Sequence, residues 1–190
     1  MLKTDVFKSY SGKNLEALLK QEEKIRIQLL SNPGDIKLKR ELGKILYYKG
    51  DVNGAIKIAL KVDELQPKKS EVHAFLGYLY YENEEYQKSI EHLNISLDLD
   101  PKTPFLYFLL GNAYSRVGKI KEAIHFYDLA IFLDFDMYQA HLDFAKRYED
   151  IARYEKALKE YEAAFEIDYR GQELKEKIDL LKAKIKKAKN

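Results

Sequence analysis

Residues 70–103, SEVHAFLGYLYYENEEYQKSIEHLNISLDLDPKT, and residues 104–137, PFLYFLLGNAYSRVGKIKEAIHFYDLAIFLDFDM, repeat one pattern of small and large side chains. The eighth position is glycine in both, the twentieth is small and the twenty-fourth is large: Gly77, Ser89 and Leu93, then Gly111, Ala123 and Tyr127. Small residues recur where two helices cross closely, and large residues fill the space beside the crossing. The pattern therefore predicts one packed pair of helices in each stretch.

The same period continues on both sides of these stretches and predicts four repeats: 36–69, 70–103, 104–137 and 138–171. The first two repeats end at Pro67 and Pro101, which cannot continue a preceding helix. The last two carry Phe135 and Tyr169 at the corresponding place. We expect the break between the two helices of each repeat at one shared position, which is occupied in turn by Gly50, Glu84, Gly118 and Ala152.

The flanking segments are predicted to cover the apolar ends of the array. Residues 172–190 place Leu174, Ile178, Leu181 and Ile185 on one face at helical spacing, which predicts a capping helix. Residues 1–35 are interpreted as a degenerate half repeat. Its second helix is expected over 14–31, and its first helix is reduced to a short amphipathic segment with Leu2, Val6, Phe7 and Tyr10. Solenoids need such caps because a terminal repeat otherwise exposes an apolar face to water.

With these spacings the chain resembles the tetratricopeptide repeat family, whose pattern joins a leucine–glycine pair, a tyrosine, an alanine, an aromatic residue and a closing proline. The resemblance implies an all-α, right-handed superhelical solenoid of helix-turn-helix repeats with terminal capping helices. It also implies that the first helix of each repeat lines a concave surface, where partners of this family bind as extended peptides or helices. The family's first-helix tryptophan is replaced here by Lys39, His73, Tyr107 and His141.

The residues at concave positions predict a groove that binds a segment of another protein. This surface is basic at the first repeat and aromatic from Tyr47 to Phe108. Aromatic side chains offer large contact areas with few rotors to freeze, which is why they dominate binding hot spots. We therefore predict a non-catalytic adaptor or scaffold, and we expect alanine at Tyr78 or Phe108 to weaken binding of an apolar or amphipathic partner segment while the array stays folded. The predicted groove residues are Lys37, Arg40, Lys44, Tyr47, Tyr48, Phe75, Tyr78, Tyr81, Phe105, Phe108, Leu109 and Asn112.

Other interpretations of this surface stay open. Its aromatic residues could serve packing alone, and the N-terminal segment or a second copy of the chain is an alternative occupant, because an exposed apolar patch is also an oligomerisation surface. Self-assembly as a homo-oligomer, through the groove or through the caps, is therefore the alternative function. The chaperone C-terminal carboxylate that one subset of the family binds does not fit, because Phe108 replaces the lysine expected before Asn112 and Asp143 replaces the next asparagine.

The composition excludes several classes of site. The chain contains no cysteine, which excludes disulfides, thiolate metal sites and cysteine nucleophiles. Its four histidines are not spaced to share a metal ion on one helix, and no glycine-rich nucleotide-binding loop is present. We therefore expect no catalytic residue, no metal and no cofactor.

Charge and hydropathy predict a soluble, cytoplasmic protein without a nucleic-acid partner. The formal net charge is only +2, and nucleic-acid binding calls for a basic excess. The longest apolar run, residues 105–110, is too short to span a bilayer, and the N-terminus lacks the apolar core of a secretion signal. The lysines after Arg170 are interpreted as part of the cap, with contact to an anionic surface as the alternative.

Overall fold

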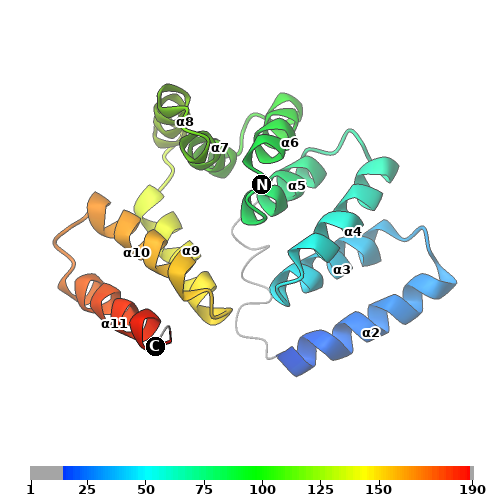
Figure 1. Ribbon diagram of the computed structural model, residues 1–190. Helices are drawn as coiled ribbons and strands as arrows, with labels where there is room; N and C mark the ends of the chain where they lie inside the picture. The colour runs from blue at the N-terminus through cyan, green and yellow to red at the C-terminus, as the bar shows by residue number, and fades with distance from the viewer. Residues whose placement is uncertain (1–14, 189–190) are drawn as a thin grey trace. The chain divides into compact units, whose positions relative to one another are not determined.

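The computed structural model describes residues 15–188 of the chain (Figure 1). Every regular element in this range is an α-helix, which confirms the predicted all-α class. The expected first helix of the half repeat, with Leu2, Val6, Phe7 and Tyr10, lies outside the described residues. The helices are α2 (Leu15–Ser31), α3 (Ile36–Tyr48), α4 (Val52–Leu65), α5 (Ser70–Glu82), α6 (Tyr86–Leu99), α7 (Pro104–Arg116), α8 (Ile120–Phe132), α9 (Met137–Asp150), α10 (Tyr154–Ile167) and α11 (Gln172–Ala188).

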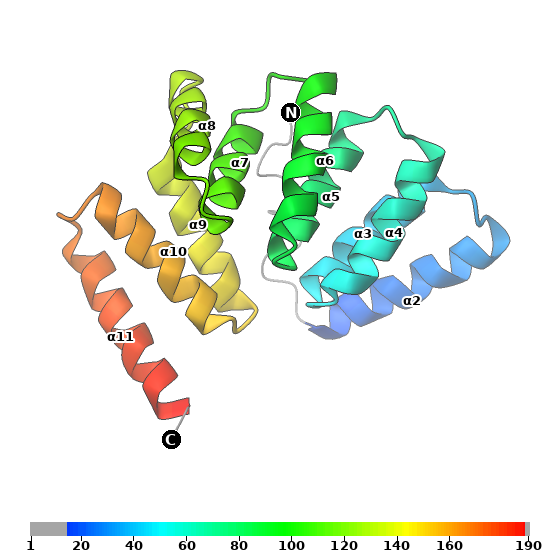
Figure 2. The ribbon, with the colours of Figure 1, turned by 45° about the horizontal axis from the view of Figure 1, so that its top comes forward.

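The helices pack as successive pairs. Helices α3 and α4, α5 and α6, α7 and α8, and α9 and α10 lie side by side, and each pair is joined by a short turn (Figures 1 and 2). Helix α2 packs against α3, α4 against α5, and α6 against α7. Apolar residues three and four apart on each helix point into these contacts, and Ile45, Leu76, Leu93 and Leu110 are completely buried there. Between residues 15 and 188, no helix is both long enough and apolar enough to cross a lipid bilayer.

The glycines at the eighth repeat position are required by the close crossing of the paired helices. A Cβ atom added to Gly77 would lie 2.6 Å from the side chain of Leu93, and one added to Gly111 would lie 2.4 Å from the ring of Tyr127. Leu93 and Tyr127 are the large residues that the sequence places at the twenty-fourth position. The predicted packing of small against large residues is thus confirmed in both of these helix pairs.

The turn between the two helices of a pair has the same geometry in all four cases. Its central residue adopts the left-handed backbone conformation, with φ of +85° at Gly50, +63° at Glu84, +77° at Gly118 and +58° at Ala152. The N–H group of the following residue donates a hydrogen bond to the carbonyl five residues earlier, which satisfies the end of the first helix. Glycine adopts this conformation freely, whereas a side chain costs about 1–2 kcal/mol.

The turn after α8 differs from the other turns that join one repeat to the next. The residues that close α4, α6 and α10 have φ between −135° and −150°. After α8, Asp134 instead adopts a φ of +56°, and the N–H group of Phe135 donates to the carbonyl of Ala130 at 3.1 Å. A proline could not make this hydrogen bond, because it has no N–H group. The chain divides into two compact units at this turn, between Phe135 and Asp136.

The second unit consists of α9, α10 and α11. Ala145 and Ala157 are completely buried where α9 and α10 cross, and Tyr148 is 2% exposed beside them. Helix α11 packs on α10 and buries Ile178 and Leu181.

Lysines on α11 are bound to the helices of their own unit. The Nζ atom of Lys177 lies 2.7 Å from a carboxylate oxygen of Glu149, and that of Lys182 lies 2.8 Å from Glu162. The Nζ atom of Lys184 lies 3.8 Å from the centroid of the Tyr154 ring, within the range of a cation–π interaction. These contacts agree with the interpretation of the C-terminal lysines as part of a cap.

Candidate functional site

The predicted groove residues lie on α3, α5 and α7, the first helices of the first three repeats. Four are half-buried, namely Arg40, Lys44, Tyr48 and Phe75, and Lys37 is exposed. The other seven have exposed fractions of 0–9%: Tyr47, Tyr78, Tyr81, Phe105, Phe108, Leu109 and Asn112. These seven, called the inner layer below, are therefore packed side chains, and the charged residues of α3 are the more accessible part of the predicted site.

A chain of hydroxyl groups crosses the inner layer. The rings of Tyr47 and Tyr78 meet edge to face, with centroids 5.4 Å apart, and their hydroxyl oxygens are 2.5 Å apart. The Tyr78 hydroxyl donates to Oε1 of Glu82 at 2.8 Å. Because that hydroxyl proton points to the carboxylate, the Tyr47 hydroxyl is the donor to Tyr78. Glu82 is 3% exposed, so this network places an acidic group inside an otherwise apolar layer.

A second part of the inner layer is a cluster of phenylalanines. The ring centroid of Phe135 lies 5.2 Å from that of Phe108 and 6.3 Å from that of Phe105. Tyr127 contacts Phe108 from α8, at 6.3 Å between centroids. Phe135, which the sequence analysis noted only as a missing proline, thus helps to bury Phe108.

Burial changes the expected effect of two substitutions. Tyr78 is 2% exposed and Phe108 is completely buried, and replacing a buried aromatic residue by alanine costs about 3–5 kcal/mol of stability. The expectation that alanine at either position leaves the array unaffected therefore does not hold.

Two polar residues of the predicted groove have internal partners. Nη2 of Arg40 donates to the side-chain oxygen of Gln66 at 3.0 Å. Oδ1 of Asn112 accepts a hydrogen bond from the Tyr127 hydroxyl at 2.8 Å. Both side chains hold elements of the first unit together, so Lys37 and Lys44 are the better candidates for contact with a charged group on a partner.

Two histidines, the buried His73 and the half-buried His92, form a pair between α5 and α6. Nδ1 of His73 lies 3.1 Å from Nδ1 of His92, and Nε2 of His73 lies 2.9 Å from the carbonyl oxygen of Pro67. A carbonyl only accepts, so Nε2 of His73 donates to it and Nδ1 of a neutral His73 accepts from His92. Burial lowers the pKa of His92, and the neighbouring His73 lowers it further. No group of three histidine, aspartate or glutamate residues within 15–188 is arranged to hold a metal ion.

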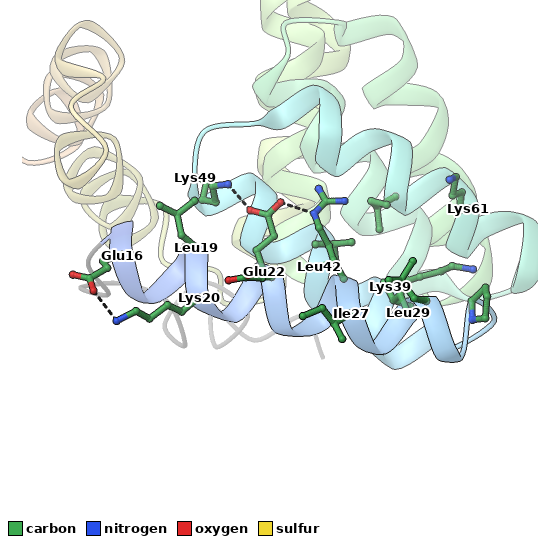
Figure 3. A pocket seen from close by; sticks show the side chains of 15 residues that line it. Glu16, Leu19, Lys20, Glu22, Ile27, Leu29, Lys39, Leu42, Lys49 and Lys61 are labelled. Carbon is green, nitrogen blue, oxygen red and sulfur yellow. Dashed lines mark hydrogen bonds and ion pairs between the residues drawn. The ribbon is translucent and has the colours of Figure 1, made fainter.

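A groove beside α2 is a second candidate surface, which the sequence analysis did not identify. It has a volume of about 870 Å³ and is lined by residues of α2, α3 and α4 (Figure 3). Leu42 of α3 lies in its lining and is 1% exposed. Helix α2 contributes Leu19 and Leu30, which are 47% and 82% exposed, and Lys39 and Lys61 also line it. Large apolar side chains therefore face solvent on this side of α2.

The apolar residues of α2 do not share one face of the helix. Among Leu18, Leu19, Ile25 and Leu30, only Leu18 and Ile25 are buried, at 4% and 3%. Leu19 and Leu30 lie about 100–140° away from them around the helix. The signal was present in the sequence, because residues 15–31 carry too many apolar residues for one face.

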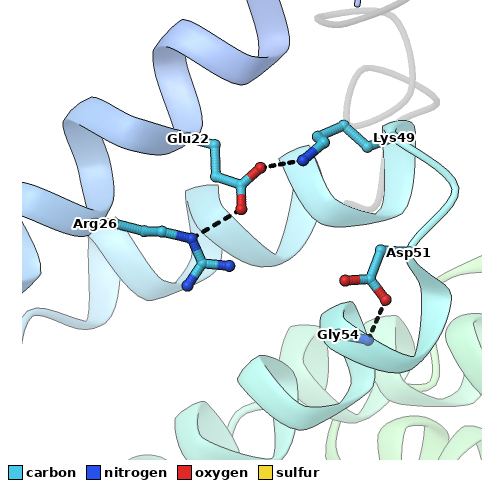
Figure 4. A network of polar contacts seen from close by, with 5 residues as sticks. All are labelled: Glu22, Arg26, Lys49, Asp51 and Gly54. Atoms are coloured by element: carbon cyan, nitrogen blue, oxygen red, sulfur yellow. Dashed lines mark hydrogen bonds and ion pairs between the residues drawn. The ribbon is translucent and has the colours of Figure 1, made fainter.

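Glu22 fixes α2 to the end of α3. Its Oε1 accepts a hydrogen bond from Nε of Arg26 at 2.8 Å, and its Oε2 contacts Nζ of Lys49 (Figure 4). Burial raises the pKa of Glu22, but the hydrogen bonds and positive charges of Lys49 and Arg26 outweigh burial and leave the pKa below its usual value. The carboxylate is therefore ionised at neutral pH. In the same view, Asp51 caps α4 by accepting from the N–H group of Gly54 at 2.8 Å.

Two overlapping stretches match known repeat families. Residues 77–118 match a family described as TPR repeat, and residues 106–136 match one described as tetratricopeptide repeat. Both matches lie within the helix pairs whose glycines and facing large residues are described above.

Individual proteins are also similar to this chain in sequence or in fold. BBSome complex member BBS4 of Bos taurus is 45% identical over 83 residues, which are 44% of this chain and 16% of that protein. The chain thus spans a small part of the length of such curated relatives. The crystal structure of MamA protein has a TM-score of 0.62 at 23% identity, with 86% of this chain and 88% of that chain covered. A thermophilic TPR protein of Thermus thermophilus has a TM-score of 0.55 at 19% identity, covering 88% of this chain and 93% of that chain.

Proposed function

We propose that this chain, in which residues 77–118 and 106–136 match tetratricopeptide repeat families, is a non-catalytic scaffold that holds a peptide or helix of a partner protein along α3, α5 and α7. The observation that carries the proposal is the accessible basic edge of α3, where Lys37 is exposed and Lys44 is half-buried. The half-buried aromatic residues Tyr48 and Phe75 lie on α3 and α5. A partner segment with apolar residues and flanking carboxylates fits this arrangement.

Partner binding is tested with variants that change the accessible edge and leave the inner layer intact. A partner is captured with the full chain, its bound segment is mapped, and the affinity of the labelled segment is measured by fluorescence anisotropy. In Lys37→Glu/Lys44→Glu, we expect the dissociation constant to rise by at least about tenfold, because two attractions become repulsions.

The matched control is Lys57→Glu/Lys68→Glu, which makes the same charge change at exposed positions outside this edge. The control is expected to bind the segment like the wild type. Equal affinity of the edge variant and the wild type, with the same helical content by circular dichroism, would remove α3 from the proposed site. The proposal includes a cytoplasmic location, which microscopy of the tagged chain in its own cells tests.

Self-assembly is the second candidate function, and a different surface favours it. Leu19 and Leu30 on α2 are exposed to solvent, which is unusual for large apolar residues that share one side of a helix.

A further inference from the structure

We propose that two copies of this chain associate through their α2 helices, which pack antiparallel about a two-fold axis. The contact surface is the α2 stripe, defined as Leu19, Glu23, Arg26 and Leu30. The inference specifies the surface and the partner for self-assembly, and it does not depend on partner binding at the inner layer, which involves other helices.

The four residues of the α2 stripe lie along one side of the helix. Their spacings of four, three and four residues keep them on one face, over about 16 Å of helix. Glu23 is exposed, and the side chain of Arg26 is 55% exposed. With the exposures of Leu19 and Leu30 given above, the whole stripe is accessible to another protein.

The order of residues in the stripe is self-complementary. It reads apolar, acidic, basic, apolar from Leu19 to Leu30. When a second α2 runs antiparallel, Leu19 faces Leu30 of the second copy, and Glu23 faces Arg26 of the second copy. Because the two copies are related by a two-fold axis, each of these contacts occurs twice in the dimer. A parallel arrangement would place Glu23 against Glu23 and Arg26 against Arg26, so charge selects the antiparallel one.

The surroundings of the stripe suit this arrangement. Arg26 pairs with Glu22 in the single chain, and Glu22 keeps Lys49 when Arg26 turns to a second copy. In the antiparallel register, Glu16 of the second copy falls near the C-terminal end of α2. That end of the groove carries Lys39 and Lys61 (Figure 3), which gives a further attraction between opposite charges. The interface is small, so we expect a dimer that dissociates on dilution.

The experiment is to measure the mass of the full chain in solution by sedimentation equilibrium over a wide range of concentration. The wild type is expected to approach twice its 22.3 kDa mass as concentration rises. Glu23→Arg places arginine against Arg26, and Arg26→Glu places glutamate against Glu23. Each single variant is expected to raise the dimer dissociation constant by at least about tenfold, because like charges then meet twice.

Two combinations make the test specific for the antiparallel register. The double variant Glu23→Arg/Arg26→Glu restores opposite charges and is expected to dimerise like the wild type. An equimolar mixture of the two single variants also pairs arginines with glutamates, so it is expected to form heterodimers more tightly than either variant forms homodimers. The matched control is Lys24→Glu, a charge reversal at an exposed α2 position off the stripe, which is expected to dimerise like the wild type.

Several outcomes would overturn the proposal. A wild type that stays monomeric at every concentration would overturn it. Dimers that appear only after removal of residues 1–14 would show that this segment, and not a second copy, covers the α2 stripe. Dimers that persist in both single variants would move the interface elsewhere. Circular dichroism of each variant checks that it is folded. Loss of partner binding in Lys37→Glu/Lys44→Glu with dimerisation intact, or the reverse, separates this proposal from the proposed function.

Discussion

Helices α2 and α11 have the same length of 17 residues, and each packs on one neighbouring helix of its own unit, but their solvent-facing sides differ. Helix α2 exposes Leu15, Leu19, Ile27 and Leu30. The only large apolar side chain exposed on α11 is Leu180, and apart from Ala183 and Ala188 the other exposed residues of this helix are charged or polar. Helix α11 thus has a polar outer face, which the terminal helix of a repeat array needs. Helix α2 has an apolar outer face, which a further partner would cover.

The comparison shows that the solvent-facing side of a terminal helix decides whether the helix can end a repeat array or bind a further partner. Both helices dock in a similar way, with two buried apolar residues each. Helix α2 forms an ion pair at the end of α3, and α11 forms one with α10. The half repeat is predicted to cap the array, and α2, its described helix, has an apolar outer side. In our proposal, the charges on that side complement a second copy.

The largest effects are expected from the buried sides, where the two helices are alike. Ile25→Ala in α2 and Leu181→Ala in α11, both 3% exposed, should each lower the free energy of unfolding by about 2–4 kcal/mol through lost burial and a cavity. Urea unfolding followed by circular dichroism measures this change. A loss below about 1 kcal/mol for either residue would show that its helix is not firmly docked.

Substitutions in the ion pairs are expected to have intermediate effects on the free energy of unfolding, and the effect should be larger for α2 than for α11. Glu22→Ala leaves Lys49, whose side chain is 20% exposed, without its carboxylate and is expected to cost about 1–3 kcal/mol. Glu162→Ala removes the partner of Lys182 from a pair that is 52% and 41% exposed, which should cost less than about 1 kcal/mol. The same unfolding measurements compare the two variants. Equal losses of unfolding free energy would contradict the expectation that the less exposed ion pair contributes more.

The effect of Glu22 should also depend on pH. Its pKa in the folded chain is lowered from 4.5, so the folded state holds this proton less tightly than the unfolded state does. The stabilisation by Glu22 is therefore complete above pH 4.5 and is lost as the pH falls through the lower folded pKa. The difference in unfolding free energy between wild type and Glu22→Ala should shrink with acidification, and a difference that grows would reverse this assignment.

The smallest effects on stability are expected from the outer sides. Leu30→Ala and Leu180→Ala replace residues that are 82% and 70% exposed, so each should change the free energy of unfolding by less than about 0.5 kcal/mol at low concentration. Their effects on association should differ, because only Leu30 belongs to the α2 stripe. Sedimentation of both variants checks this, and equal self-association of the two would count against the stripe.

The sequence was sufficient to predict the paired helices because the residues that decide them are local and periodic. Gly77 and Leu93, like Gly111 and Tyr127, are a fixed number of residues apart, and their sizes alone imply a close crossing. The turn positions follow for the same reason, since Gly50 and Gly118 share their backbone conformation with Glu84 and Ala152 in the same register.

The candidate surfaces were harder to predict because exposure depends on contacts between distant residues. The predicted groove residues lie on α3, α5 and α7, but nothing in the repeat pattern revealed that Phe135 lies against Phe108. On α2, periodicity showed many apolar residues and could not tell which of them a neighbouring helix covers. A pattern identifies the faces of a helix, and only the packing shows which face is left uncovered.

The left-handed turns also show where substitutions could make the folded chain more stable. Among the described residues with positive φ, Glu84, Asp134 and Ala152 carry side chains in a conformation that suits glycine. Part of the strain at each would be relieved by glycine, less the entropy that glycine loses on folding. Natural proteins are rarely at their stability optimum. In this chain, Glu84, Asp134 and Ala152 are the positions at which we would start to engineer a more heat-resistant form.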